Sequence, residues 1–231
     1  MTAALSTFLL PPAARPADWL TFAHDPQRTG WAFEELELNT KTVPNLTLLW
    51  KAKAENESYS LSALTSPVVA EKVSTAKGIR TVVYVAGISG TVFAFEAQTG
   101  ELIWTYKIKN FVESKKNVYE FQGTFLCPNG ITATPVIDKR TQILYVLGPD
   151  GMLYGLDLGS GGLRYGPIQF VAPFSKNWSL SLVDSKVYTT LSQGCGNGIS
   201  GFYSIDVRDP HRPVIEQGLI SNTNTAGIGG R

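Results

Sequence analysis

Side chains capable of acid–base, nucleophilic or metal-binding chemistry are scarce in this sequence of 231 residues, which has two histidines and two cysteines. His24 precedes Asp25, a pair that could transfer a proton but that equally suits a turn or a cap. His211 lies among prolines and is predicted to be turn surface. Two isolated cysteines and two histidines lack the close spacing of zinc ligands. No motif of a serine hydrolase, a phosphate-binding loop or a zinc protease occurs, so no catalytic, metal-binding or cofactor-binding residue is assigned.

The composition is that of a turn-rich β protein with almost no net charge. Lys and Arg number 20 against 19 Asp and Glu, which gives a formal net charge of +1. This balance provides no overall field to attract nucleic acid, so we expect no nucleic-acid partner. The chain has 22 glycines and a charged fraction of 17%, as turn-dense all-β proteins do. No apolar run is long enough to cross a bilayer, so we do not expect a transmembrane protein.

The elements that must position any site are short strands, most evident at residues 82–104. This stretch reads VVYVAGISGTVFAFEAQTGELIW and predicts a three-stranded meander. Within it a small residue, a carboxylate, a Thr-Gly pair and a tryptophan follow one another at fixed spacing: Ala94, Glu96, Thr99, Gly100 and Trp104. We expect the carboxylate to accept N–H groups of the turn, the glycine to adopt positive φ, and the tryptophan to cover a neighbouring sheet.

The same pattern recurs, so it is a repeat rather than a chance match. The second copy places its landmarks 61 residues further on, and consists of Gly155, Asp157, Ser160, Gly161 and Tyr165. A third, degenerate copy contains Asp206 but lacks the Thr-Gly pair. Four short strands per unit, repeating at intervals of this size, are the sequence signature of β-propeller blades.

The pattern A-x-D-x-x-T-G-x-x-x-W resembles the repeat of the pyrroloquinoline quinone (PQQ) type propellers over residues 18–231. The resemblance implies an all-β fold, an incomplete PQQ-like β-propeller with about three four-stranded blades. We expect these blades at residues 60–108, 130–172 and 178–220, with residues 221–231 starting a further blade. Leu46–Ala52, which includes Trp50, is predicted to be a stray outer strand whose blade-mates lie elsewhere.

The N-terminal region divides into two parts. Residues 18–30 resemble the strap that precedes the first blade in PQQ-type propellers. Residues 1–17 are expected to be either disordered or the remainder of a secretion signal, because their apolar run has no positively charged leader. Since the family it resembles is largely periplasmic or secreted, we expect the same location here.

Two insertions depart from the minimal blade, and each contains one of the cysteines. They cover residues 108–130, with Cys127, and residues 193–198, with Cys195. In an exported protein a Cys127–Cys195 disulfide would join the two loops, and the alternative is two unpaired thiols.

Two function classes remain open. Enzymes of the PQQ-dependent type use adjacent cysteines, a stacking tryptophan and Glu, Asn and Asp ligands for Ca²⁺, but this sequence has no Cys-Cys dipeptide and no position that can be assigned to a ligand. It therefore favours a non-catalytic binding or scaffold module of the cell envelope or exterior, whose blade loops bind a protein or polymer. The alternative is the N-terminal portion of a PQQ- and Ca-dependent alcohol or sugar dehydrogenase. Three blades leave apolar faces uncovered, so we expect a requirement for further C-terminal blades or for self-association.

Overall fold

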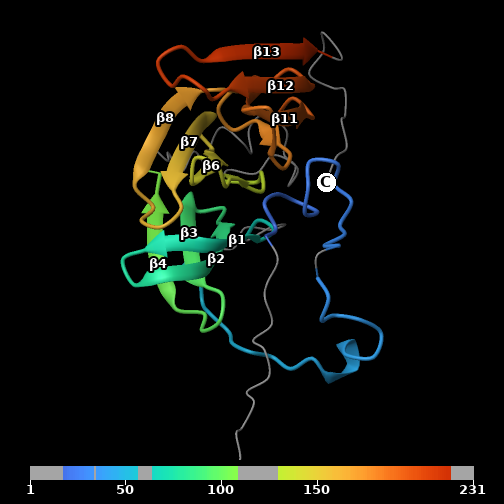
Figure 1. The fold of residues 1–231 in the computed structure, drawn as a ribbon. Helices are drawn as coiled ribbons and strands as arrows, with labels where there is room; N and C mark the ends of the chain where they lie inside the picture. The colour runs from blue at the N-terminus through green and yellow to red at the C-terminus, as the bar shows by residue number, and fades with distance from the viewer. Residues whose placement is uncertain (1–17, 34, 57–63, 109–129, 220–231) are drawn as a thin grey trace, which may run out of the picture.

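The computed structural model describes residues 18–33, 35–56, 64–108 and 130–219, and in these residues the regular structure is almost entirely β (Figure 1). The elements are η1 (Val43–Asn45), β1 (Val68–Thr75), β2 (Gly78–Ala86), β3 (Thr91–Glu96), β4 (Leu102–Lys107), β5 (Val136–Asp138), β6 (Ile143–Leu147), β7 (Met152–Asp157), β8 (Leu163–Gln169), β9 (Lys176–Asn177), β10 (Ser181–Val183), β11 (Lys186–Ser192), η2 (Cys195–Asn197), β12 (Gly201–Asp206) and β13 (Val214–Leu219). Both described helices are single 3₁₀ turns, and neither could span a membrane.

The strands form three separate antiparallel sheets. The first has the order β1-β2-β3-β4 and the second the order β5-β6-β7-β8. The third has the order β10-β11-β12-β13, with β9 added alongside β11. The sheets are stacked face to face (Figure 1). The first copy of the repeat lies in the first sheet and the second copy in the second sheet, so the two copies do not share one continuous sheet. The all-β prediction is confirmed.

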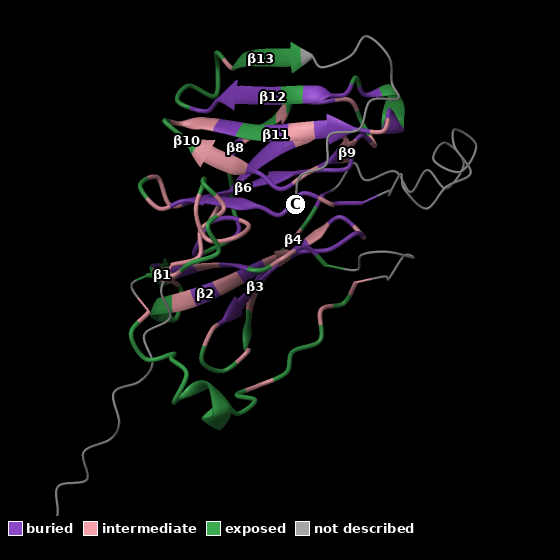
Figure 2. Ribbon diagram, turned by 90° about the vertical axis from the view of Figure 1, so that its right-hand side faces the viewer, coloured by how far each residue is buried: buried purple, intermediate pink, exposed green. Residues whose placement is uncertain are grey.

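Burial follows from this stacking. All five residues of β6 are buried, because the second sheet lies between the other two and both of its faces are covered. The outer strand β4 is less covered, with Trp104 buried and Leu102, Thr105 and Lys107 exposed. In Figure 2 the buried residues are concentrated where the sheets face one another.

Two hydrophobic cores correspond to the two interfaces between sheets. One joins the first and second sheets, with Tyr84, Trp104, Leu144 and Leu156 among its members. The other joins the second and third sheets, with Tyr145, Tyr165, Val187, Tyr203 and Ile205 among its members. Consecutive residues of β6, Leu144 and Tyr145, therefore contribute to different cores, as the period of two in a strand requires.

The strap, residues 18–30, contacts the inner edge of all three sheets, which is formed by β1, β5 and β10. Trp19 pairs with β1 through two backbone hydrogen bonds of 2.9 and 2.8 Å. The carbonyl of Leu20 accepts an amide of β5 at 2.8 Å. Thr21 Oγ1 donates to the carbonyl of the residue before β10 at 2.6 Å. Three consecutive strap residues thus connect three different sheets.

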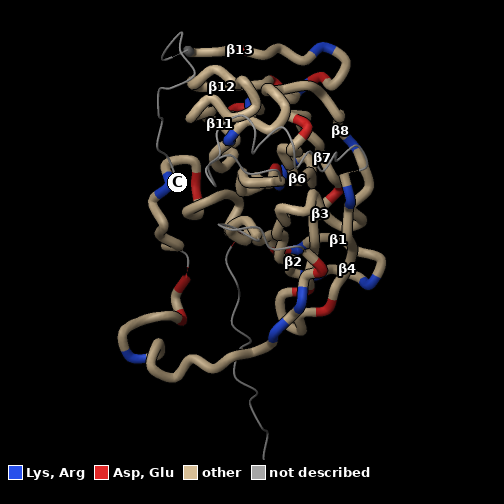
Figure 3. The backbone as a smooth tube through the Cα atoms, turned by 180° about the vertical axis from the view of Figure 1, so that it is seen from behind, with Lys and Arg blue, Asp and Glu red and all other residues tan. Residues whose placement is uncertain are grey.

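Residues 46–56 belong to no sheet of the described part of the chain, although Trp50 within them contacts the first sheet. The preceding stretch carries η1 and is largely exposed. In Figure 3 acidic and basic residues of the described chain are interspersed over the loops and strand ends.

Candidate functional site

The residues of the repeat meet at the turns between the third and fourth strands of the first two sheets. In the first sheet Glu96 Oε2 accepts the backbone N–H of Gln98 at 3.0 Å and both the N–H and the hydroxyl of Thr99 at 2.7 Å. Burial disfavours the charged carboxylate, but these hydrogen bonds outweigh it and hold the pKa of Glu96 below its usual range. Residues 96–101 are called the first carboxylate turn below.

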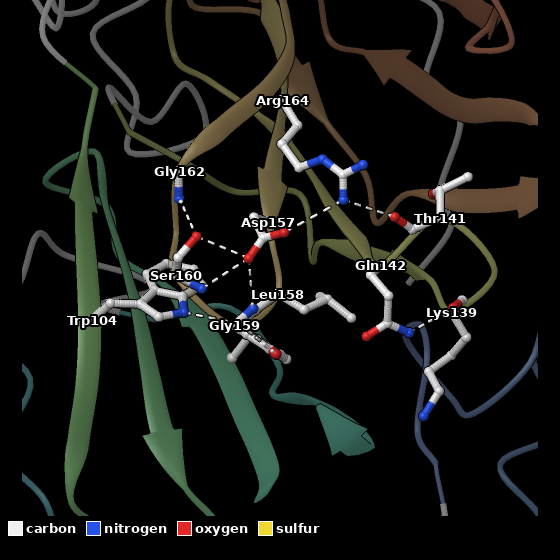
Figure 4. A network of polar contacts seen from close by, with 11 residues as sticks. Trp104, Lys139, Thr141, Gln142, Asp157, Leu158, Gly159, Ser160, Gly162 and Arg164 are labelled. Atoms are coloured by element: carbon white, nitrogen blue, oxygen red, sulfur yellow. Dashed lines mark hydrogen bonds and ion pairs between the residues drawn. The ribbon is translucent and has the colours of Figure 1, made fainter. Parts of the chain in front are cut away.

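The second carboxylate turn, residues 157–162, repeats this geometry (Figure 4). Asp157 Oδ1 accepts the N–H of Gly159 at 3.1 Å, the N–H of Ser160 at 3.0 Å and the hydroxyl of Ser160 at 2.8 Å. Its other oxygen faces Arg164 Nη1 at 3.4 Å. Both predicted carboxylates therefore stabilise their own turns.

Each carboxylate turn is covered by a tryptophan from outside its own sheet. Trp104 Nε1 donates to Leu158 O at 2.9 Å, and a Cβ on Gly161 would lie 2.6 Å from the indole Cδ2. Trp50 Nε1 donates to Ala97 O at 2.8 Å, and a Cβ on Gly100 would lie 2.6 Å from its Cδ2. Glycine is required at both positions for two reasons. Gly100 and Gly161 have positive φ (+72° and +70°), and a side chain at either would collide with the indole ring above it.

The small residues of the pattern make room for the aromatic ones. Ala94 pairs with Trp104 across β3 and β4, and Gly155 pairs with Tyr165 across β7 and β8. A Cβ on Gly155 would lie 2.6 Å from Tyr165 Cβ. The repeat residues thus form an interlocking contact between sheets, and they do not assemble a reaction centre.

The junction between the second and third sheets is a weaker version of this contact. Tyr165 replaces tryptophan, and its buried hydroxyl has no hydrogen-bond partner among the described residues. Burial, together with the charges of Asp206 and Asp209, raises the pKa of Tyr165 to about 12. The facing turn has no glycine, and Asp206 Oδ1 accepts the N–H and Nε of Arg208 at 3.0 and 2.9 Å. These hydrogen bonds lower the pKa of Asp206 to about 2.

The exposed face of the third sheet departs further from the pattern. Strand register shows which residues stand in equivalent rows: Val68, Tyr84, Ala94 and Trp104 in the first sheet; Val136, Tyr145, Gly155 and Tyr165 in the second; Ser181, Tyr188, Ser204 and Glu216 in the third. A carboxylate therefore occupies the aromatic position. Glu216 accepts Lys186 Nζ at 2.8 Å and Ser204 Oγ at 3.2 Å. The position of Glu216 in this row was not predicted from the sequence, because the third copy of the repeat lacks the turn motif that would fix the strand register.

The acid–base candidates have structural roles. Asp25 accepts the N–H of Thr29 at 3.0 Å together with its hydroxyl, and these bonds lower the pKa of Asp25. His24 Nδ1 lies 3.4 Å from Asp25, and its ring packs edge-on against Trp19 at 5.2 Å. His211 is exposed, and its N–H bonds to Asp209 Oδ1 at 2.8 Å. The pair and the lone histidine are therefore parts of turns.

Cys195 is buried in η2, whereas Cys127 lies outside the described residues, so the disulfide stays a prediction. Within the described chain no group of three or more His, Cys, Asp or Glu could hold a metal ion.

Polar contacts of the strap were not evident from the sequence. Asp18 Oδ1 accepts the N–H of Glu71 at 2.7 Å and Lys139 Nζ at 3.1 Å. Arg28 Nη2 donates to Ser179 O at 2.9 Å and to Ser181 Oγ at 3.3 Å. The partners are far away in sequence, and no local spacing signals them.

Solved structures share this fold. No protein-family model and no curated protein sequence matches the chain. The quinohemoprotein alcohol dehydrogenase from Comamonas testosteroni aligns with a TM-score of 0.62 at 20% identity, over 89% of this chain and 28% of that one. Quinohemoprotein alcohol dehydrogenase ADHIIG from Pseudomonas putida HK5 gives 0.55 at 17% identity, over 84% and 25%. A europium-containing methanol dehydrogenase gives 0.53 at 19% identity, over 88% and 33%.

These likenesses establish the fold, a partial β-propeller of the PQQ type. This chain spans between a quarter and a third of the length of the proteins it matches.

Proposed function

We propose that this chain is a PQQ-like propeller unit that acts as a binding or scaffold module in the cell envelope or outside the cell. In this proposal residues 60–108, 130–172 and 178–220 are three blades, residues 221–231 begin another, and a protein or polymer partner covers apolar surface that the three sheets leave open. The location outside the cytoplasm follows from the family resemblance.

The observation that carries the proposal is the apolar segment, residues 31–33 and 35–49. Its large side chains are exposed to an unusual degree, with Trp31 at 69%, Leu36 at 85% and Leu48 at 74%. Figure 2 shows most of this segment in green, running outside the stacked sheets. Large apolar side chains exposed in such number over a short segment are unusual in soluble monomers, and exposed apolar patches mark sites of protein association.

A second surface supports the same class of function. On the outer part of the third sheet Phe202 and Val214 are 54% and 55% exposed, near the ion pair of Lys186 with Glu216. Protein interfaces combine apolar side chains with hydrogen-bonded polar groups at their rim. We propose that the partner covers both surfaces, and that further propeller blades or a second copy of the chain can take the place of a separate protein.

Photo-cross-linking tests the proposal. A photoreactive amino acid at Leu48 in the full chain should give a discrete cross-linked product in producing cells, either a dimer or an adduct of defined mass. Ile79 provides the matched control, because it is 70% exposed but is an isolated apolar residue on β2. Equal cross-linking at both positions, or a monomer without products, would count against a specific partner.

Light scattering on a size-exclusion column gives a second test. Replacing Leu46, Leu48 and Leu49 by serine should abolish any association seen in the parent chain, whereas Ile79→Ser should leave the mass unchanged. Retention of the assembly in the triple variant would contradict the assigned surface.

The second candidate function is the N-terminal portion of a PQQ- and Ca-dependent alcohol or sugar dehydrogenase. It is favoured by one observation, namely that the three solved structures reported above are dehydrogenases. Among the described residues no group of three or more His, Cys, Asp or Glu comes together, so no ligand for Ca²⁺ is assigned there. Addition of PQQ and Ca²⁺ to the full-length protein, followed by quinone absorbance and dye reduction with alcohols, distinguishes the enzyme from the scaffold.

A further inference from the structure

The guanidinium of Arg28 is held between the strap and the third sheet. Its Nη2 donates to Ser179 O at 2.9 Å and to Ser181 Oγ at 3.3 Å. The ring of Phe22 lies on one side, with Cζ 5.6 Å from the ring centroid. These contacts fix the plane of the guanidinium, so its remaining donors point in a defined direction.

The same guanidinium is left with an unmade hydrogen bond. Arg28 Nη1 is shielded from solvent and has no acceptor in the described part of the chain. A buried donor on a charged group is costly to leave unpaired, more so than a neutral one. Burial lowers the pKa of Arg28, which reflects the same uncompensated desolvation.

No carboxylate of the described residues forms an ion pair with Arg28. Asp25, the nearest carboxylate in sequence, is already committed to Thr29 and faces His24. Carbonyl and hydroxyl oxygens are the acceptors that Arg28 has, and neither neutralises its charge. No described residue therefore neutralises the charge of Arg28.

We propose that Arg28 binds the carboxylate of a small organic acid at the inner edge of the third sheet. Both N–H groups of Nη2 are engaged, so Nη1 provides the donor, and one of its N–H groups can form a charge-assisted hydrogen bond with a carboxylate oxygen. Ser181 Oγ, which accepts from Nη2, still has its own proton to donate to the same ligand. This role is independent of the scaffold and dehydrogenase proposals, since it uses only strap and β10 residues.

Because Nη1 is shielded from solvent, a ligand can reach it only if neighbouring residues move. Arg28 belongs to a surface turn, since residues 26, 27, 29 and 30 on both sides of it are exposed. The turn is closed by two backbone bonds of 2.9 Å, from Arg28 N to Asp25 O and from Gly30 N to Ala23 O. A bound anion should tighten this turn, because it would hold the guanidinium from the opposite side.

Calorimetric titration of the full chain with acetate, succinate and citrate tests the proposal, with chloride and sulfate at matched ionic strength. We expect saturable binding of at least one carboxylate, weakened about tenfold or more in Arg28→Gln. Arg28→Lys should bind more weakly than the parent chain, since lysine keeps the charge but has no second nitrogen to bind Ser179 and Ser181 while the first binds the ligand. Hydrogen exchange at the amides of Arg28 and Gly30 should slow when the ligand is present.

A matched variant separates ligand binding from loosening of the strap. Thr21→Val removes the 2.6 Å bond from Thr21 Oγ1 to Leu180 O but leaves the guanidinium untouched. It should lower stability and retain carboxylate binding. Binding by Thr21→Val that is as weak as that of Arg28→Gln would overturn the proposal, as would the absence of saturable carboxylate binding in the folded parent chain.

Discussion

The carbonyl of Leu158 at the junction between the first and second sheets provides a quantitative test of how the sheets are joined. It accepts two side-chain donors from the first sheet, Trp104 Nε1 at 2.9 Å and Tyr84 Oη at 2.9 Å. No third donor to this oxygen occurs in the described residues. Leu158 and Tyr84 are fully buried and Trp104 is 8% exposed, so water cannot readily replace either donor.

The two single variants should each be mild. Tyr84→Phe removes one hydrogen bond and leaves the other, at a cost of about 1 kcal/mol. Trp104→Phe removes one bond and part of a ring, at a cost of about 1–2 kcal/mol. The double variant leaves a buried carbonyl without a partner, which adds about 1–3 kcal/mol to the sum of the two.

Urea unfolding followed by far-ultraviolet circular dichroism measures these values, because the strand signal does not depend on the substituted tryptophan. Tyr165→Phe at the next junction is the control. Its hydroxyl has no partner, so the free energy of unfolding should stay unchanged or rise slightly. Strict additivity of Tyr84→Phe and Trp104→Phe, or a large loss in Tyr165→Phe, would refute the assignment of these contacts.

Three further outcomes are expected. Gly161→Ala should destabilise the fold by about 2–4 kcal/mol, since its Cβ would lie 2.6 Å from Trp104 Cδ2 at a φ of +70°, and equilibrium unfolding checks this value. The hydrogen bonds from Arg208 lower the folded-state pKa of Asp206 from 3.8 to about 2. The stabilisation by ionised Asp206 is therefore present above pH 4 and is lost as the pH falls toward 2. It should be smaller in Arg208→Met, and the urea midpoints of both proteins between pH 2 and pH 4 measure the difference. If the predicted Cys127–Cys195 disulfide forms, the parent chain should migrate more slowly in a denaturing gel after reduction than before it. The mobility of Cys195→Ser should be the same with and without reductant.

Local features of the fold could be predicted from the sequence. Glu96 and Asp157 bind groups two and three residues ahead, so the turn chemistry is contained in the pattern itself. Gly100 and Gly161 show the positive φ that their position in the turn suggested. Repetition of these local signals was enough to predict separate sheets.

Long-range contacts could not be predicted in the same way. Trp50 forms a hydrogen bond with Ala97, and Arg28 forms one with Ser179. Nothing in the sequence between these residues indicates that they meet. Glu216 occupies an aromatic position only because of strand register in the third sheet, where the turn motif is degenerate. Pairing of this kind depends on how the sheets pack, which a single sequence shows only where the motif is well kept.

The strap also has a mechanical consequence. Because Trp19, Leu20 and Thr21 are consecutive, their hydrogen bonds to the three sheets are separated by only a few ångströms of chain. The strap therefore has little extra length between one sheet and the next. One sheet cannot tilt away from its neighbour without pulling on the next anchor. Under an applied force the three sheets should therefore move together as one rigid body, held at their inner edge by the strap.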